Sequence, residues 1–382
     1  MTESSSKVLA RIERELRDVW LAPEPAGGSL PPKSRVCTMN LLVAGPRDLM
    51  DGYTHVVDEV TASIPARAIL IALDPDAEDS ELSGDATAVC SLLGGKNICS
   101  ERVRLVAQGA VCTRVASAVD SILVPEIPTA LVWLGRVHVT DPVFLSLSAS
   151  AQRIITDSEY SSLSSLLHLS AWARRGSSQA SIADLAWTRL APWQELFARF
   201  FDDPRLHDHA SRITRLAFRQ ASEAGARLGS EGALLLGWVA TRLGWRTSRM
   251  GGALRFHRRD GKNLPIDFGV TPRPEGTAPS SLASVRLEAD HGDVHVEGAI
   301  ERELASGLSS DAVDADMVNW TLRVGGAPPI EQRVRFGANK AAKWLERTLH
   351  RPARDPALAE SVAFAEEVLE DGVVCGAPSH PR

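Results

Sequence analysis

Apolar residues in the first half of the chain come in short continuous runs, separated by stretches with helical spacing. Residues 38–44 and 68–73 are two such runs, and the first ends at a glycine–proline pair. Runs of this length are typical of strands that are buried on both faces of a sheet. Between them, apolar residues recur at helical spacing from Leu49 to Ile64, and Pro65 ends the pattern. The pattern predicts a strand–helix–strand unit with a right-handed parallel crossover.

The same pattern continues through the first half of the chain. It predicts helices at residues 111–124 and 163–169, and four further strands at 87–93, 103–107, 130–134 and 153–157. Strands that alternate with helices are typical of an α/β layer fold. Residues 35–180 are therefore expected to form an α/β domain with a parallel or mixed, doubly wound sheet. Residues 1–34 are expected to hold an amphipathic helix and a linker rich in proline and glycine.

Alternating apolar and polar residues dominate the second half of the chain. After a helical segment at 184–201 and a strand at 212–219, Ser230 is expected to cap a helix that Gly244 ends. Alternation then predicts an antiparallel meander, with strands at 253–258, 265–270, 282–287, 294–300, 320–324 and 332–336. A closing helix is predicted at 339–349. Residues 181–350 are thus expected to form an α+β domain with flanking helices, and residues 351–382 a C-terminal helix with a disordered tail.

Residues 182–203, with the sequence IADLAWTRLAPWQELFARFFDD, concentrate aromatic side chains. The segment holds five of the twenty aromatic residues of the chain. Counted from Trp193, the apolar positions fall at helical spacing, at Leu196, Phe197, Phe200 and Phe201. This spacing predicts a helix with one buried face. Packing in the core is the favoured interpretation of Trp187 and Trp193, although tryptophan and arginine also dominate interface hot spots.

Composition and charge narrow the class of protein. The chain has 382 residues, of which 44% are hydrophobic and 24% charged, which is enough for two or three domains with buried cores. The net charge of −6 argues against general binding to nucleic acids or anionic membranes. The N-terminal residues lack the apolar core of a secretory signal, and no apolar run reaches eighteen residues. A cytoplasmic location is therefore expected.

The cysteines indicate no disulfide framework. Their number is odd and no CxxC pair occurs, since they stand at Cys37, Cys90, Cys99, Cys112 and Cys375. Neither a secreted disulfide scaffold nor a zinc ribbon is therefore indicated. Free thiols that are at least partly buried are the favoured interpretation. A redox-active pair stays open as an alternative, because the spacing singles none out.

The sequence offers only weak candidates for a phosphate-binding loop. The first predicted strand ends at Gly45 and Pro46, and proline has no N–H, whereas a dinucleotide fingerprint needs several glycines. The sequence GGKN at 94–97 resembles a P-loop only in part. Cys90 stands where the loop needs its first glycine, and Asn97 replaces the Ser or Thr that would hold magnesium. No cofactor is therefore predicted.

One set of residues resembles a metal site. His291, Asp293, His295 and Glu297 would share one face of a strand, and these residue types suit zinc or another divalent ion. The favoured alternative is the solvated face of an edge strand, with the intervening valines turned to the core. No G-x-S-x-G nucleophile elbow occurs. No catalytic residue and no metal ligand is therefore predicted, and we expect a protein that is not an enzyme.

Two basic clusters suggest a charged partner. The first is Arg212, Arg215 and Arg219, and the second surrounds a predicted hairpin tip with Arg255, Arg258, Arg259 and Lys262. A solvated positive surface is one interpretation of them. The other is a patch that binds an acidic protein or a phosphorylated ligand. The residues predicted to bind a partner are Trp187, Arg189, Trp193, Arg255, Arg258 and Arg259.

Three sequence blocks occur in order along the chain. They are RIITDS at 153–158, DLAWTRLAPW at 184–193, and the helix that contains Gly237 and Trp238 and ends at Leu243-Gly244. Together they resemble the glucose-6-phosphate dehydrogenase assembly protein (OpcA) family, over about residues 35–350. The second block is the most specific, because two tryptophans spaced in this way around Thr-Arg-Leu and a proline rarely occur by chance.

The resemblance implies a function without supplying a catalytic motif. It implies a two-part, non-catalytic protein that assists the assembly and the allosteric activation of glucose-6-phosphate dehydrogenase, the entry enzyme of the oxidative pentose phosphate pathway, and thereby NADPH metabolism. The implied partner is that dehydrogenase, in a hetero-oligomer, with no nucleic acid or membrane. The alternative is an α/β protein or enzyme that binds a sugar phosphate or a nucleotide at the carboxyl ends of its strands.

Overall fold

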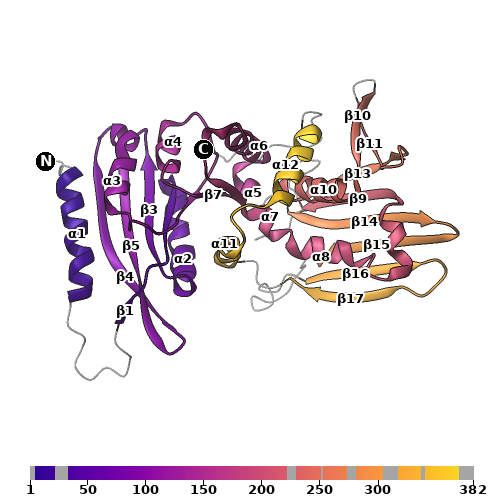
Figure 1. Ribbon diagram of the computed structural model, residues 1–382, viewed down its shortest axis with the longest axis horizontal. Helices are drawn as coiled ribbons and strands as arrows, with labels where there is room; N and C mark the ends of the chain where they lie inside the picture. The colour runs from indigo at the N-terminus through magenta and orange to yellow at the C-terminus, as the bar shows by residue number, and fades with distance from the viewer. Residues whose placement is uncertain are drawn as a thin grey trace. The chain divides into compact units, whose positions relative to one another are not determined.

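The computed structural model describes residues 5–21, 33–221, 229–250, 253–272, 281–303, 317–336 and 340–369 (Figure 1). They form two compact units, each assembled from separate stretches of chain. The first unit comprises Met1–Asp157, His168–Ala183 and Ala341–Arg354, and the second comprises Ser158–Leu167, Asp184–Lys340 and Asp355–Arg382. The predicted fold class is confirmed, because an α/β unit is combined with an α+β unit.

The first unit is built on an eight-stranded sheet with the order β1-β5-β3-β2-β6-β7-β8, in which β4 pairs with β5. Along the order from β1 to β7 the pairing is parallel, and β4 pairs with β5 in the antiparallel direction. The strands are β1 (Lys33–Arg35), β2 (Met39–Pro46), β3 (Ala66–Asp74), β4 (Leu82–Leu93), β5 (Lys96–Gln108), β6 (Thr129–Trp133), β7 (Arg153–Thr156) and β8 (Ser181–Asp184). The central strands β2, β3 and β6 are almost completely buried, as their continuous apolar runs predict.

Helices cover both faces of this sheet. One layer contains α1 (Ser5–Leu21), α3 (Val115–Ile122) and α4 (Pro142–Ser148), and a 3-10 turn at Gly109–Arg114 leads into α3. The other layer contains α2 (Arg47–Ser63) and α11 (Ala341–His350). The amphipathic spacing of α1 buries Val8, Ile12 and Leu16 in the core of the unit. The N-terminal helix is therefore part of the α/β unit.

Helix α11 is the predicted closing helix, but it packs on α2 in the first unit. Arg153 at the start of β7 explains how this distant helix is held. Its guanidinium donates to the carbonyl oxygens of Thr348 at 2.9 Å, Leu349 at 3.3 Å and Arg351 at 2.9 Å. These carbonyls lie at the end of α11, where a helix has no partners of its own for its last C=O groups. Arg153, the first residue of the RIITDS block, therefore caps a helix about 190 residues further along the chain.

The second unit contains a six-stranded mixed sheet with the order β13-β9-β14-β15-β16-β17. Its strands are β9 (Ile213–Ala221), β13 (Ile266–Thr271), β14 (Leu282–His291), β15 (Val294–Arg302), β16 (Met317–Val324) and β17 (Ile330–Arg335). From β9 to β17 the pairing is antiparallel, as the meander predicts. The prediction was wrong for β13, which pairs with β9 in parallel.

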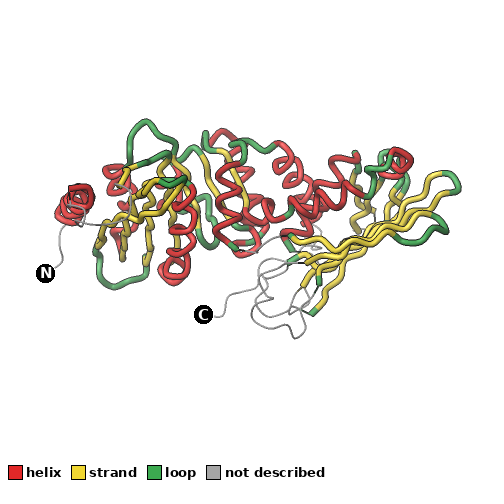
Figure 2. Tube along the Cα trace, turned by 90° about the horizontal axis from the view of Figure 1, so that it is seen from below, coloured by secondary structure: helices red, strands yellow, loops and turns green. Residues whose placement is uncertain are grey.

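Helices lie on one face of the six-stranded sheet in Figure 2. The helices of the second unit are α5 (Ser158–Ser161), α7 (Leu185–Arg189), α8 (Ala191–Arg199), α9 (His207–Ala210), α10 (Ser230–Leu243) and α12 (Pro356–Leu369), with a 3-10 turn at Pro204–Leu206. The division between the two units falls within helix α6 (Leu163–Trp172), after Leu167, and the π-helical turn Ala173–Ser177 that follows α6 belongs to the first unit. Gly244 ends α10 in the left-handed conformation, as predicted, with φ of 68°. The expected Ser230 cap was wrong, because Gly229 is the N-cap and Ser230 is already helical.

A separate three-stranded sheet with the order β10-β11-β12 completes the second unit. It consists of β10 (Arg246–Met250), β11 (Ala253–His257) and β12 (Asn263–Leu264). Phe256 of β11 stacks on Phe364 of α12, with ring centroids 6.3 Å apart. The small sheet is thus anchored to the C-terminal helix through one of its faces. No described helix is long and apolar enough to cross a membrane.

Candidate functional site

A buried hydrogen-bond cluster joins the blocks that carry the family resemblance. The carboxylate of Asp184 accepts hydrogen bonds from the backbone N–H of Ser158 at 2.7 Å, the Ser158 hydroxyl at 3.0 Å and the backbone N–H of Trp187 at 3.0 Å. Asp184 is only 1% exposed and is the N-cap of α7. A carboxylate satisfies unpaired N–H groups at a helix start and is stabilised by the helix dipole. One side chain therefore joins the end of the first block to the start of the second.

An ion pair extends this cluster to α10 and β14. Arg189 donates to Glu231 at 2.9 Å, and their side chains are 11% and 3% exposed. The second carboxylate oxygen of Glu231 accepts the backbone N–H of Leu282 at 3.0 Å. The hydroxyl of Ser230 donates to the carbonyl oxygen of Ser158 at 2.8 Å. Each of the three blocks thus contributes polar residues to one buried network, which holds elements of the second unit together.

The aromatic residues of the second block are also buried. Trp187 donates its indole N–H to Asp355 at 2.7 Å and is 4% exposed. Trp193 is 1% exposed and packs edge-on against Phe336, with the Arg302 guanidinium 5.6 Å from the centroid of its ring. Trp187 and Trp193 therefore have a packing role, as the helical spacing indicated.

The six predicted partner-binding residues differ in their accessibility. Trp187, Trp193 and Arg189 lie in the buried core just described. Arg258 is 5% exposed and its guanidinium donates to Asp260, whereas Arg255 and Arg259 are exposed. Contact of any of these six residues with a partner stays a prediction.

The first basic cluster is neutralised by carboxylates. Arg212 lies 3.3 Å from Asp260, Arg215 lies 3.8 Å from Glu288, and Arg219 lies 2.6 Å from Asp267. Arg215 and Arg219 stand on the face of the six-stranded sheet opposite the buried side chains of β9. Such cross-strand pairs stabilise a solvated sheet face. The solvated-surface interpretation therefore fits this cluster.

The carboxyl ends of β2, β3 and β6 border a hollow of about 670 Å³. This is the position where doubly wound folds bind ligands. Its charged lining consists of two arginines and five aspartates, namely Arg47, Arg136, Asp48, Asp51, Asp74, Asp76 and Asp141. The excess of carboxylates repels phosphate groups. A β-carbon on Gly45 would lie 2.6 Å from Cβ of Leu134, so this glycine allows close strand packing instead of an approach to phosphate.

The glycines of the GGKN sequence form a hairpin turn between β4 and β5. Gly94 and Gly95 have φ values of 58° and 76°, which are typical of the two central residues of a type I′ turn. This turn sets the register of the hairpin and places Cys90 directly opposite Cys99. The incomplete P-loop match is therefore explained by a turn that links two antiparallel strands.

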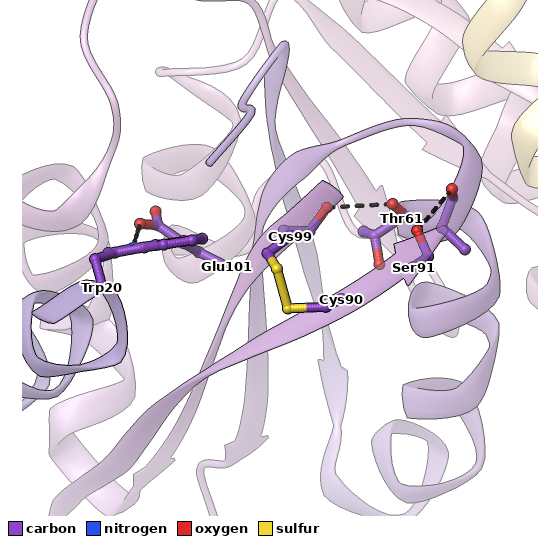
Figure 3. Close-up of a disulfide and its surroundings, with 8 residues drawn as sticks. Trp20, Thr61, Cys90, Ser91, Cys99 and Glu101 are labelled. Atoms are coloured by element: carbon purple, nitrogen blue, oxygen red, sulfur yellow. Dashed lines mark hydrogen bonds between the residues drawn. A yellow bond between two sulfur atoms is a disulfide. The ribbon is translucent and has the colours of Figure 1, made fainter. Parts of the chain in front are cut away.

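The expectation of free thiols was wrong for Cys90 and Cys99, which form a disulfide across β4 and β5 (Figure 3). The signal was the two-glycine turn, because its register brings these two residues together. Cys37 and Cys112 are free, and burial raises the pKa of both thiols. Cys375 lies outside the described residues. A thiol with a raised pKa is a poor nucleophile at neutral pH, which argues against catalysis by Cys37 or Cys112.

Glu101 lies near this disulfide and is 2% exposed (Figure 3). Trp20 of α1 donates its indole N–H to this carboxylate at 2.8 Å. Arg67 and Arg35 pair with the same carboxylate at 2.6 Å and 2.8 Å. Paired charges and a bound indole satisfy a buried carboxylate without any ligand. We therefore assign Glu101 to holding α1 on the sheet.

The four residues that resemble a metal site in the sequence do not lie on one strand. His291 ends β14 and His295 lies on β15, and Asp293 lies in the tight turn between these strands. The side chain of His295 contacts Asp290 at 2.6 Å and Glu297 at 3.5 Å, and Asp290 is the main cause of its raised pKa. In the described part of the chain, no three His, Cys, Asp or Glu residues are grouped to hold a metal ion.

These observations define a class of protein, in which an α/β unit is combined with an α+β unit whose central polar network serves packing. The chain belongs to the glucose-6-phosphate dehydrogenase subunit family, OpcA. Residues 57–170 match the model described as the glucose-6-phosphate dehydrogenase subunit N-terminal domain. Residues 180–362 match the model of the corresponding C-terminal domain.

Curated relatives carry the name "Putative OxPP cycle protein OpcA". The protein from Synechocystis sp. is 30% identical over 195 residues, which cover 49% of this chain and 39% of the relative. The protein from Synechococcus elongatus is 27% identical over 239 residues, which cover 59% of this chain and 52% of the relative. The matched regions thus span about two-fifths to half of the length of these relatives.

Solved structures with a similar arrangement are oxidoreductases of very low sequence identity. A levoglucosan dehydrogenase in complex with NADH and L-sorbose is 9% identical, with a TM-score of 0.43, covering 90% of this chain and all of that chain. An oxidoreductase from Sinorhizobium meliloti is 12% identical, with a TM-score of 0.42, covering 89% of this chain and 92% of that chain.

Proposed function

We propose that this protein is a non-catalytic assembly factor and allosteric activator of glucose-6-phosphate dehydrogenase in the oxidative pentose phosphate pathway. The observation that carries the proposal is the match of two consecutive regions to the two domains of the dehydrogenase subunit family. The buried network supports a scaffold role, because the most distinctive residues of the chain hold elements together. The acidic hollow at the carboxyl ends of the strands supports a role that does not involve binding a nucleotide.

The proposed mechanism is a shift in the populations of two states of the dehydrogenase. The protein binds the active, oligomeric or substrate-competent state more tightly than the inactive state and so raises its population. At saturation the equilibrium constant between the two states changes by the ratio of the two affinities, which sets the upper limit of the activation. A tenfold activation needs a coupling free energy of only about 1.4 kcal/mol, well within the range of ordinary interfaces.

The test combines activity with assembly. The glucose-6-phosphate dehydrogenase encoded in the same genome is assayed with and without this protein, and the mixture is analysed by size-exclusion chromatography with light scattering. We expect a hetero-oligomer and a raised kcat/KM or a lowered KM for glucose 6-phosphate. An equal concentration of an unrelated acidic protein controls for crowding. Unchanged kinetics together with separate elution of the two proteins would show that the proposal is wrong.

Catalysis is measured in the same experiment. This protein alone is incubated with glucose 6-phosphate and NADP⁺, and NADPH formation is followed by absorbance. We expect no turnover without the dehydrogenase. Turnover by the purified protein alone, at a rate proportional to its concentration, would contradict the non-catalytic role.

A further inference from the structure

The hairpin of β10 and β11 has one anchored face and one outward face. The register pairs Arg246 with His257 and Ser248 with Arg255, and Met250 follows at the same spacing, so these five residues share a face. The other face carries Thr247, which contacts Glu367 of α12, and Phe256, which stacks on Phe364. Because that face is held on α12, the face with Arg246, Ser248, Met250 and Arg255 points away from the unit.

This outward face combines exposed cations with an exposed apolar side chain. Arg246, Ser248 and Arg255 are exposed, and Met250 is 61% exposed. On β10, Ser248 lies between Arg246 and Met250. Arg255 lies opposite Ser248 on the neighbouring strand β11. The described residues offer no carboxylate partner to Arg246 or Arg255, in contrast to the paired arginines of the six-stranded sheet. We call Arg246, Ser248, Met250 and Arg255 the hairpin face.

Charge in this part of the chain is opposite to that of the whole. Residues 246–264 contain six arginines and lysines and one aspartate, a net charge of +5, whereas the complete chain carries −6. The positive charge is therefore concentrated on one small sheet of a negatively charged protein. Such a local field steers association with a surface of opposite charge.

Protection of a strand edge explains only part of this pattern. Strand β10 is the edge of its sheet, and arginines on an edge strand hinder unwanted pairing with other chains. An exposed methionine works against that purpose, because it adds apolar surface at the same edge. An arginine pair beside an adaptable apolar residue is instead the composition of a protein-binding hot spot.

We propose that the hairpin face is the docking surface for an acidic patch on the dehydrogenase, an inference that rests on the proposed function. Carboxylates of the partner pair with Arg246 and Arg255, and Met250 packs into an apolar depression beside the carboxylate that pairs with Arg255. Nucleic acid is disfavoured as the occupant, since the hairpin face offers no Phe, Tyr or Trp ring for base stacking and the rest of the chain is strongly acidic. An anionic membrane is disfavoured by the same overall charge.

The test compares matched variants in their affinity for the dehydrogenase. The double substitution Arg246→Glu with Arg255→Glu reverses the charge of the hairpin face, and Met250→Ser removes its apolar contact. The control Arg47→Glu with Arg136→Glu makes the same change of net charge at two exposed arginines of the first unit. Affinity is measured by biolayer interferometry at 50 and 300 mM salt, and thermal melting confirms that each variant is folded.

We expect the charge reversal to weaken binding at least tenfold at 50 mM salt, mainly through slower association, with a smaller effect at 300 mM. Met250→Ser should weaken binding about tenfold at both salt concentrations, through faster dissociation. The control variant should bind like the wild type. If the wild type binds but the hairpin variants bind equally well, the hairpin inference is wrong and the proposed function stands. If the wild type itself does not bind or activate the dehydrogenase, the proposed function fails.

The same variants test the other classes of partner. Wild type and charge-reversal variant are titrated with a 20-base-pair DNA duplex and with vesicles of one-third phosphatidylserine. We expect negligible binding of both proteins to either probe. Loss of binding to DNA or vesicles in the variant, with unchanged binding to the dehydrogenase, would assign the hairpin face to that other class and overturn the inference.

Discussion

At the scale of single residues, Asp184 carries the densest set of buried interactions in the signature blocks. Its carboxylate accepts three hydrogen bonds from Ser158 and Trp187. In Asp184→Asn, the amide keeps the shape but presents an NH₂ group to donors, so at least one buried N–H or O–H loses its acceptor. We expect the free energy of unfolding to fall by about 2 to 3 kcal/mol, measured by urea denaturation with tryptophan fluorescence.

A matched control separates this effect from the mere loss of a negative charge. Asp202→Asn makes the same chemical change at an exposed position shortly after α8. We expect its unfolding midpoint to stay close to that of the wild type. Equal midpoints for the two variants would show that the Asp184 network contributes little to stability.

The pair of His295 and Asp290 predicts a pH-dependent contribution to stability. The pKa of His295 is raised mainly by its hydrogen bond to Asp290, and the pKa of Asp290 is lowered by the same contact. The raised histidine pKa contributes stability that is complete below the unfolded value of 6.5 and is lost as the pH rises through the folded value. The lowered aspartate pKa contributes stability above the unfolded value of 3.8 that is lost as the pH falls. The pair therefore stabilises the fold between these limits.

His295→Gln tests this window. We expect the variant to be less stable than the wild type at pH 5.5 and equally stable at pH 9, as measured by urea midpoints at both values. The loss at pH 5.5 should be below about 1 kcal/mol, because both side chains are about half exposed and solvent screens the pair. A difference of the same size at both pH values would point to packing in place of charge.

Residue roles were predictable only where a local pattern decides them. The burial of Trp193 follows from apolar spacing along its own helix, and the conformation of Gly244 follows from its place at a helix end. The partners of Asp184 and Arg153 were not predictable, because they come from residues 26 to almost 200 positions away. The burial of Arg258 was likewise not predictable, because its guanidinium reaches the carbonyl oxygen of Ile213, 45 positions away.

At the scale of elements, the close contact of α10 with α12 explains why residue 237 is a glycine, which the sequence alone did not indicate. A β-carbon at this position would lie 2.4 Å from the carbonyl oxygen of Ser361. The two helices must therefore separate in Gly237→Ala, and we expect the free energy of unfolding to fall by about 1 to 3 kcal/mol. Urea denaturation of the purified variant measures the change.

Gly52→Ala, in another helix, is expected to change the free energy of unfolding in the opposite direction. Gly52 lies inside α2, and a β-carbon there would meet no atom within 4 Å. Alanine should raise the free energy of unfolding by about 0.5 to 1 kcal/mol, because it restricts the unfolded chain and favours the helix. If both alanine variants were stabilised, the close approach of α10 and α12 would be refuted.

The β4–β5 hairpin predicts a measurable thiol count. Its disulfide joins two cysteines that face each other across the strands. Denatured protein treated with a reductant should therefore release two more titratable thiols than denatured protein without reductant, measured with a chromogenic disulfide reagent. A Cys90→Ser variant serves as control: it leaves Cys99 as a free thiol, so its thiol count should be the same with and without reductant. Equal counts in the wild type with and without reductant would contradict the disulfide.

Most strands and helices were predictable, because the spacing of apolar residues along each element indicates which of its residues are buried. The buried runs of β2, β3 and β6 and the amphipathic spacing of α2 each match their elements. The parallel pairing of β13 with β9 was not predictable, because neighbouring strands of similar pattern favour a simple meander. The packing of α11 on α2 was not predictable either, because an amphipathic pattern shows that a helix has a buried face but not which element covers that face.

At the scale of the whole molecule, the proposed function and its alternative make opposite predictions about small ligands. A protein that binds a sugar phosphate or nucleotide is stabilised by it, by about 2.7 kcal/mol at a ligand concentration of 100 times Kd. The five aspartates at the carboxyl ends of the strands repel such ligands. We therefore expect no shift in the melting temperature with millimolar glucose 6-phosphate, NADP⁺, NADPH or ATP.

The same thermal-shift experiment has a positive arm. Addition of the dehydrogenase should raise the melting temperature of this protein, because a partner that binds only the folded state stabilises it by mass action. The double variant Asp74→Asn with Asp76→Asn removes two charges from the hollow and should leave the response to the dehydrogenase unchanged. A saturable shift of more than about 2 °C with one of the small ligands, lost in a variant with a blocked hollow such as Asp51→Trp, would favour the alternative. A shift with the dehydrogenase alone would instead favour the scaffold, since its binding energy would then come from a protein surface and not from the crevice of the α/β unit.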